Sequence, residues 1–127
     1  MSRSGRGGPR PDRQRAWRHG RMAEAVAVGR LRLGGWRIVA RNWKCPFGEI
    51  DIIARRRHIL AFIEVKTRAE MAAAGEAIGA RQQDRIRRAA ALYLAHRPVY
   101  AALDARFDAI LVLPWRWPVH VRDAWRD

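Results

Sequence analysis

Two apolar runs separated by four basic residues most strongly constrain how this chain can fold. Residues 48–54 read Gly-Glu-Ile-Asp-Ile-Ile-Ala, residues 59–66 read Ile-Leu-Ala-Phe-Ile-Glu-Val-Lys, and Arg-Arg-Arg-His lies between them. Both runs are rich in the branched and aromatic residues that favour strands, and the connection is short and polar. The pattern predicts an antiparallel β-hairpin.

The alternation of side chains along a strand divides each run between two faces. One pair of faces is wholly apolar: Ile50, Ile52 and Ala54 in the first run, and Ile59, Ala61, Ile63 and Val65 in the second. The other pair holds Glu49, Asp51 and Ile53, and Leu60, Phe62, Glu64 and Lys66. A slip by one residue would exchange the faces, so the apolar faces meet only in registers that pair odd with even positions. Pairing Asp51 with Glu64 or with Phe62 satisfies this condition. In either register Asp51, Glu64 and Lys66 converge on one side of the hairpin.

The other segments complete an α/β pattern. Apolar periodicity predicts helices over residues 20–33, ended by Gly34-Gly35, and over residues 81–96, stopped by Pro98. We expect strands over residues 36–40 and 106–113, loops over residues 42–46 and 67–79, and a short strand or turn within residues 114–127. We therefore predict one domain over residues 20–127, preceded by a disordered basic tail over residues 1–19.

The charge of the chain points to a polyanionic partner. Lys and Arg number 26 against 12 Asp and Glu, for a net charge of +14. Nucleic acid is the first expectation, and an acidic protein or membrane surface the second. A basic composition without any specific partner is the remaining alternative. Of the 26 basic residues, all are Arg except Lys44 and Lys66.

Other features exclude several classes of protein. The single Cys45 allows neither an intrachain disulfide nor a multi-cysteine zinc site. No apolar run approaches the roughly 20 residues of a membrane span. The N-terminal region lacks the apolar core of a signal peptide. We therefore expect a cytoplasmic protein without a membrane partner.

Asp51, Glu64 and Lys66 predict a metal-dependent hydrolytic site. Two neighbouring carboxylates repel unless a cation lies between them, and hard oxygen ligands suit Mg²⁺ or Mn²⁺ rather than zinc. The backbone carbonyl of Val65 is the natural third ligand. Lys66 would orient a water and stabilise developing negative charge, and a lysine, unlike an arginine, can lose its proton when it is desolvated. The alternative is a solvated pair on an exposed strand face.

Three further acids, Glu24, Glu49 and Asp108, are candidates for places near the site or in the core. Glu24 shares a helix stripe with Ala27, Val28 and Leu31, so it points towards the core and needs a cation or a donor. Alternatively, it is a first-turn acid favoured by the helix dipole. We expect Glu49 to lie behind the site or in solvent, and Asp108 to be a satisfied acid at a strand end.

Basic residues on the second helix form a candidate phosphate-binding stripe. Arg81, Arg85 and Arg88 recur at helical spacing, and together with Arg68 they are our predicted nucleic-acid contacts, although a solvated helix face has the same spacing. Gln82 and Gln83 are further candidates to reach a phosphate or the Lys66 water. The six Trp residues are expected to anchor the core or a hinge rather than to stack on bases.

The paired blocks resemble a known family. Asn42, Phe-Gly-Glu-Ile-Asp-Ile-Ile-Ala at 47–54 and Phe-Ile-Glu-Val-Lys-Thr-Arg at 62–68 resemble the YraN-like family of bacterial proteins, also called UPF0102. The resemblance spans roughly residues 20–125. It extends to Ala23-Glu24, Gly35, Arg85-Ile86, Ala89-Ala90, Tyr93-Leu94 and Arg106-Phe107-Asp108.

The resemblance implies a restriction-endonuclease-like fold, similar to archaeal Holliday-junction resolvases, with a central mixed sheet flanked by helices. It implies that Asp51, Glu64 and Lys66 occupy the PD-(D/E)xK positions and that Glu24 matches the acid of the first helix. Where such sequences often carry Lys at the start of the second long helix, this chain has Gln82.

Two hypotheses follow from the sequence. The first is a Mg²⁺- or Mn²⁺-dependent endonuclease acting on structured or branched DNA, with a homodimer as one way to cut two strands. The second is a nucleic-acid-binding or scaffolding protein that keeps the fold without turnover.

Overall fold

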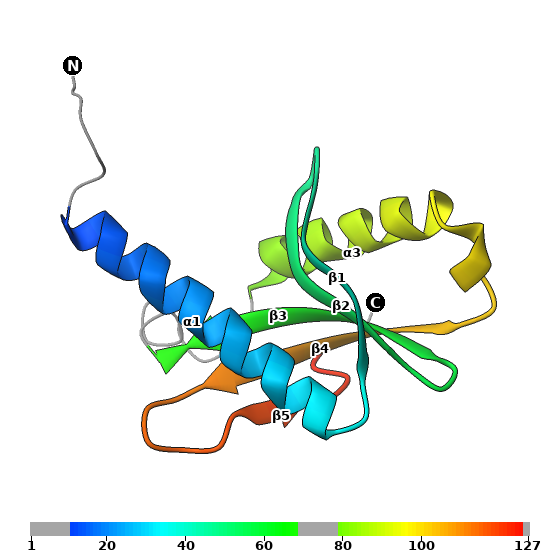
Figure 1. Cartoon of the computed structure of the whole chain (residues 1–127). Coiled ribbons are helices and arrows are strands. Elements are labelled where there is room, and N and C mark those ends of the chain that lie inside the picture. Colours follow the sequence, from blue (N-terminus) through cyan, green and yellow to red (C-terminus); the bar gives the residue numbers. More distant parts are fainter. Residues whose placement is uncertain (1–10, 69–78, 126–127) are drawn as a thin grey trace.

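The computed structural model describes residues 11–68 and 79–125, and for residues 11–19 it describes only the helical backbone (Figure 1). The elements are α1 (Pro11–Leu33), β1 (Arg37–Cys45), β2 (Gly48–Arg56), β3 (Ile59–Thr67), α3 (Ala80–Ala95), a 3-10 turn η1 (Pro98–Tyr100), β4 (Asp104–Val112) and β5 (Val119–Val121). The strands form one mixed sheet in the order β1-β2-β3-β4-β5. Only β3 and β4 are parallel; the other neighbours are antiparallel.

The sheet separates two apolar cores, one under each helix. Helix α1 buries Ala27 and Leu31 against Ile52, Ile63 and Ile110, among others, on one face. Helix α3 buries Ala89, Ala90 and Tyr93 against Ile53, Leu60 and Phe62 on the other. The mixed α/β architecture is as predicted, and it is compatible with a restriction-endonuclease-like fold.

The predicted hairpin is confirmed, with one exception in its faces. In β3, alternate residues serve opposite cores, as expected. In β2, however, Ile50 packs on the α3 side with Ile53, whereas alternation placed it with Ile52 and Ala54. Strict alternation requires a regular strand, and the neighbouring strand β1 is irregular. Asn42, which precedes the Ile50 partner Trp43, adopts a φ of 51°, and a register shift between Ile38 and Ala40 lies further along the hairpin.

Helix α1 ends as predicted but begins earlier. The backbone N–H groups of Gly35 and Trp36 donate to the carbonyls of Arg32 and Leu31, and Gly35 has a φ of 86°. This is the left-handed termination that glycine favours. The helix begins at Pro11 rather than near Gly20, because arginine, alanine and glutamine are strong helix formers and proline suits a first helical position. Residues 1–10 of the predicted tail lie outside the described residues.

Strand β1 runs through a segment that was predicted to be a loop. Residues 42–45 remain paired with β2, from Trp43 opposite Ile50 to Cys45 opposite Gly48. The prediction was wrong because Trp43 and Cys45 pack against the core under α3, which outweighs the turn preference of Asn and Pro. The other elements lie within two residues of their predicted bounds, and residues 69–78 of the predicted loop lie outside the described residues. In the part of the chain that is described, no helix is long and apolar enough to cross a bilayer.

Asp108 fixes β5 against β4. Its fully buried carboxylate accepts two hydrogen bonds from Arg106 at 2.9 Å, one from His120 at 2.8 Å and one from the backbone N–H of Asp123 at 2.9 Å. Burial raises the pKa of this carboxyl, but the bonds from His120, Arg106 and Asp123 outweigh it, so the pKa is lowered overall. The prediction that Asp108 is a satisfied acid is confirmed, but its predicted place at a strand end is wrong, because Asp108 lies in the middle of β4.

We expect Asp108→Ala to destabilise the fold by about 3–5 kcal/mol, because Arg106 and His120 would lose their shared acceptor in a buried place. The matched control is Asp84→Ala, which removes an acid whose side chain is 51% exposed and pairs with Arg87 and Arg88. It should cost about 1 kcal/mol or less. Urea denaturation compares the two variants, and equal losses would show that Asp108 is not a structural anchor.

Candidate functional site

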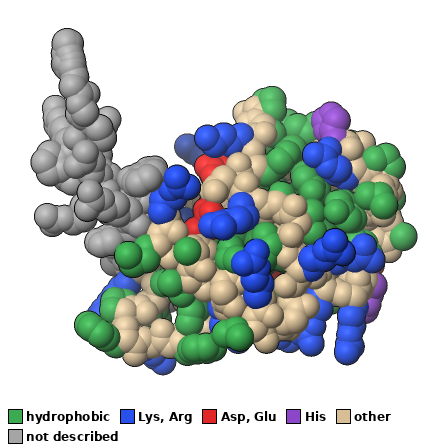
Figure 2. Space-filling model, viewed as in Figure 1, with side chains coloured by type: hydrophobic (Ala, Val, Ile, Leu, Met, Phe, Trp, Pro, Cys, Tyr) green, Lys and Arg blue, Asp and Glu red, His purple; other side chains and the backbone are tan. Residues whose placement is uncertain are grey.

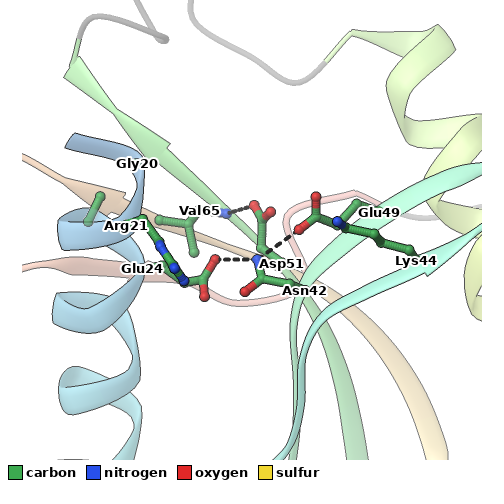
Figure 3. A pocket seen from close by; sticks show the side chains of 9 residues that line it. Gly20, Arg21, Glu24, Asn42, Lys44, Glu49, Asp51 and Val65 are labelled. Carbon is green, nitrogen blue, oxygen red and sulfur yellow. Dashed lines mark hydrogen bonds between the residues drawn. The ribbon is translucent and has the colours of Figure 1, made fainter. Parts of the chain in front are cut away.

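The candidate site lies where β2 and β3 stop pairing. The last pair of the hairpin is Ile52 with Ile63. Extended by one residue, this register sets Asp51 opposite Glu64, which is one of the two predicted alternatives. The backbone N–H of Val65 donates to Asp51 Oδ2 at 2.9 Å (Figure 3). The Val65 N–H thus donates to a side chain instead of to a backbone carbonyl of β2. This hydrogen bond holds the Asp51 carboxylate in place.

Glu64 is a buried acid with few compensating charges. It is 5% exposed, and its Oε2 accepts a short hydrogen bond from Gln82 Nε2. The guanidinium of Arg85 lies 3.9 Å from the same oxygen. Burial, followed by the hydrogen bond and charge of Asp51, raises the pKa of Glu64 from 4.5 to about 9, although Lys66 and Gln82 act in the opposite direction. Without a further cation, Glu64 is therefore protonated at neutral pH.

Asn42 connects the acids on the other side of Asp51. Its side-chain Nδ2 donates to Glu24 Oε2 at 2.6 Å and to Glu49 Oε1 at 2.7 Å (Figure 3). Its φ of 51° is left-handed, a conformation that Asn tolerates better than most residues. One amide thus ties α1, β1 and β2 together beside Asp51.

Glu24 lies on the core side of α1, as predicted. It is 7% exposed, and Arg41 lies 3.3 Å from its Oε1. Because the helix begins at Pro11, Glu24 is deep inside it, and the alternative of a first-turn acid is wrong.

Two cavities meet at the Asp51–Val65 contact. The larger, of about 730 Å³, lies between α1 and the β1–β2 hairpin; it is lined by Gly20, Arg21, Ala23, Glu24, Asn42, Lys44, Glu49, Asp51 and Val65. The smaller, of about 220 Å³, opens towards α3; it is lined by Glu49, Asp51, Glu64, Val65, Lys66, Gln82 and Arg85. Glu49, Asp51 and Val65 line both, so they form the wall between the cavities. On the face in Figure 2, red acidic side chains gather at one place with blue Lys and Arg side chains around them.

The predicted basic stripe divides into residues with different surroundings. Arg85 reaches the site, where its Nη1 also donates to the backbone carbonyl of Glu49 at 3.4 Å. Arg88 is largely exposed and pairs with Asp84 on its own helix. Arg81 and Arg68 are exposed. The positions of these residues in the sequence do not distinguish Arg85, which reaches the site, from the three exposed arginines.

The donor groups fit a hard divalent cation. Glu64 is a buried carboxyl whose pKa is raised by burial and by the adjacent Asp51, which is the situation that a bound cation relieves. In a strand the N–H and C=O of one residue point the same way, so the Val65 carbonyl points towards β2, as its N–H does. Among the described residues no group of three or more His, Cys, Asp or Glu side chains could hold an ion. A cation here would therefore depend on the predicted set: two carboxylates, the Val65 carbonyl and waters.

Sequence reasoning undervalued two neighbours of the site. Gln82 was considered only for a phosphate or a water, yet it donates to Glu64. Asn42 was assigned to a loop. Only the family resemblance, which includes Asn42, could have pointed to it. The spacing of residues in the sequence does not show that an Asn on β1 lies between two acids.

Comparisons with known proteins agree with the resemblance. A family model described as uncharacterised protein family UPF0102 matches residues 23–112. A UPF0102 protein of Parvibaculum lavamentivorans is 54% identical over 111 residues, which is 87% of this chain and 84% of the relative. A UPF0102 protein of Mesorhizobium japonicum is 47% identical over 116 residues, covering 91% of this chain and 93% of the relative. One from a Chelativorans species is 49% identical over 114 residues, covering 90% and 92%.

Substitutions at Asn42 separate its amide from its backbone conformation. Asn42→Gly keeps the left-handed backbone but removes both hydrogen bonds to carboxylates, and we expect a loss of about 1–3 kcal/mol. Asn42→Ala should lose about a further 1 kcal/mol, because a Cβ is unfavourable at positive φ. Urea denaturation in a chelator measures both. A Gly variant as stable as the original chain would show that the bridge contributes nothing, and equal Gly and Ala variants would argue against backbone strain.

The raised pKa of Glu64 predicts how stability depends on pH in the metal-free protein. Between its ordinary 4.5 and about 9, the folded state holds a proton that the unfolded state has released. Stability should therefore fall as pH rises through this window, by up to about 1.4 kcal/mol per pH unit. Glu64→Gln should flatten the curve, whereas Glu49→Gln, the control from the same cavity wall, should not. Thermal unfolding in EDTA across this range measures the slopes, and parallel curves for Glu64→Gln and the original chain would contradict the prediction.

Proposed function

Because this chain belongs to the uncharacterised protein family UPF0102, its family assigns no activity, and we propose from its site that it is a divalent-metal-dependent endonuclease acting on structured or branched DNA. The observation that carries the proposal is the pairing of Asp51 with the buried Glu64, with Lys66 beside them on a chain of net charge +14.

The buried Glu64 supports a cation-binding role. A carboxyl with a pKa of about 9 binds a cation only by releasing its proton, and Asp51 next to it doubles the charge available to that cation. Asp51 is already oriented by the Val65 N–H, which holds its carboxylate beside Glu64. When bound, Mg²⁺ or Mn²⁺ would polarise the scissile phosphate and lower the pKa of a coordinated water.

Each neighbouring residue has a separate task in this proposal. Lys66, half-buried in the smaller cavity, orients the attacking water and balances the charge that develops on the phosphate. Arg85 and Gln82 position Glu64 from α3. Asn42 keeps Glu49 and Glu24 beside the larger cavity. The basic surroundings attract the polyanion by long-range electrostatics.

One observation favours the second candidate, a nucleic-acid-binding protein without turnover. Glu64 already has a donor in Gln82 and a cation in Arg85, so protonated Glu64 satisfies its surroundings without a metal. Such a protein would bind nucleic acid in a salt-dependent way, and Asp51→Asn would leave its affinity unchanged.

Cleavage assays with purified full chain test the proposal. Plasmid, flap and four-way-junction DNA are incubated with Mn²⁺, with Mg²⁺ or with EDTA. We expect cleavage only with a divalent cation, none by Asp51→Asn, and a loss of about a hundredfold or more in Lys66→Ala.

The matched control is Arg37→Ala, which removes one exposed positive charge at the far end of β1. It should cut nearly as well as the original chain. If no substrate is cut, or if Lys66→Ala and Arg37→Ala cut equally, the nuclease proposal fails. Metal-independent binding that survives Asp51→Asn would then favour the second candidate.

A further inference from the structure

Two tryptophans are presented to solvent by the loop between β4 and β5, residues 113–118, called here the tryptophan loop. Trp115 is 102% exposed and Trp117 is 65% exposed. Of the two expected positions, core or hinge, the core position holds for Trp36 and Trp125, which are 5% and 7% exposed, but is wrong for these two. A fully exposed tryptophan leaves a large apolar surface in water, so its position calls for a binding partner.

The backbone of the loop is held in an unfavourable conformation. Trp115 has a φ of 60°, in the left-handed region that bulky residues rarely adopt. Beyond it, the buried Pro118 accepts a hydrogen bond through its carbonyl from Arg30 Nε of α1 at 3.3 Å, and Val119 begins the pairing of β5 with β4. A strained residue persists only where the surrounding structure fixes it. The exposed rings are therefore presented by an anchored loop.

The tryptophan loop begins at the same edge of the sheet as the candidate site. Strands β3 and β4 are parallel and pair Val65 with Ile110 and Thr67 with Val112. The loop leaves β4 directly after Val112, at the end of the molecule where β3 also ends (Figure 1). Trp115 is five residues beyond Ile110, so at most about 18 Å of chain separates it from the strand neighbour of Val65. One nucleic-acid strand can reach both places.

We infer that the tryptophan loop binds unpaired nucleotides adjacent to the site, with Trp115 and Trp117 stacking on bases and Arg116 contacting the phosphate between them. The inference rests on the proposed function for its substrate class, which it narrows to nucleic acid with a single-stranded stretch beside the cut. Exposed aromatic rings stack on any unpaired base, whereas bases inside a duplex are already stacked. Arg116 and Arg68 are exposed at this edge and supply positive charge for the backbone.

The position of the loop favours nucleic acid over a lipid surface. Exposed tryptophans beside arginines also suit an anionic bilayer. A bilayer resting on this edge would, however, bring lipid phosphates as a plane against the acids of the site. A single strand can thread past these acids and present one phosphate to them. The match to the family model ends at residue 112, so the loop lies beyond the segment that the model matches.

Binding assays without cleavage test the inference. The full chain carrying Asp51→Asn is titrated in EDTA into labelled oligothymidylate and into a blunt duplex, and anisotropy is measured. Adding Trp115→Ala or Trp117→Ala should weaken binding to the single strand by about tenfold each and change duplex binding much less. Arg116→Ala should weaken binding to the single strand more than its charge-matched control Arg37→Ala. Circular dichroism of each variant checks the fold.

Conservative variants separate stacking from general apolar contact. Trp→Tyr at both positions should retain most of the affinity, whereas Trp→Leu should lose it. Equal affinities of the Leu and Tyr variants, or an unchanged affinity of the double Ala variant, would overturn the inference. The inference would also be overturned if the Ala variants lost binding to phosphatidylglycerol vesicles but kept their binding to oligothymidylate. Because no step requires cleavage, an inactive protein that still binds single strands through this loop would refute the nuclease proposal and leave this inference standing.

Discussion

The burial of one carboxyl, Glu64, is the constraint around which the candidate site is organised. Burial disfavours the charged form of Glu64, and the nearby Asp51 disfavours it further. Together they raise the pKa of Glu64 to about 9. Gln82 and Arg85 reach it from α3, and Lys66 follows it on β3. The surrounding residues thus hold Glu64 in place without ionising it, which leaves the ionisation of Glu64 responsive to any further cation that binds there.

The position of Asp51 depends on an irregularity in the sheet. Because β2 and β3 stop pairing beyond Ile52 and Ile63, the Val65 N–H is available to Asp51 instead of to a strand carbonyl. On the other flank, Asn42 takes a left-handed conformation and bridges Glu24 and Glu49. A perfectly regular sheet would satisfy its own backbone and leave no such position for an acid.

The features that could be predicted from the sequence are those that follow a regular period along the chain. The hairpin, its faces along β3 and the convergence of Asp51, Glu64 and Lys66 come from a period of two, and they could be predicted. The face of Ile50, the continuation of β1 and the bridging by Asn42 could not, because they depend on a local break in that period. The register between the two alternatives was fixed only by the structure. Exposure of Trp115 and Trp117 also could not be predicted, since composition alone favours a core position for tryptophan.

Three acids are buried in the described part of this basic chain, and their surroundings differ. Asp108 is surrounded by Arg106, His120 and a backbone N–H, and these donors lower its pKa and so favour its charged form. Glu24 is held by Arg41 and Asn42. Glu64 has a raised pKa, although Arg85 lies 3.9 Å from its Oε2. A buried acid that only stabilised the fold would be expected to resemble Asp108. The raised pKa of Glu64, next to a second carboxyl and beside an open cavity, is therefore the feature on which the proposed cation site depends.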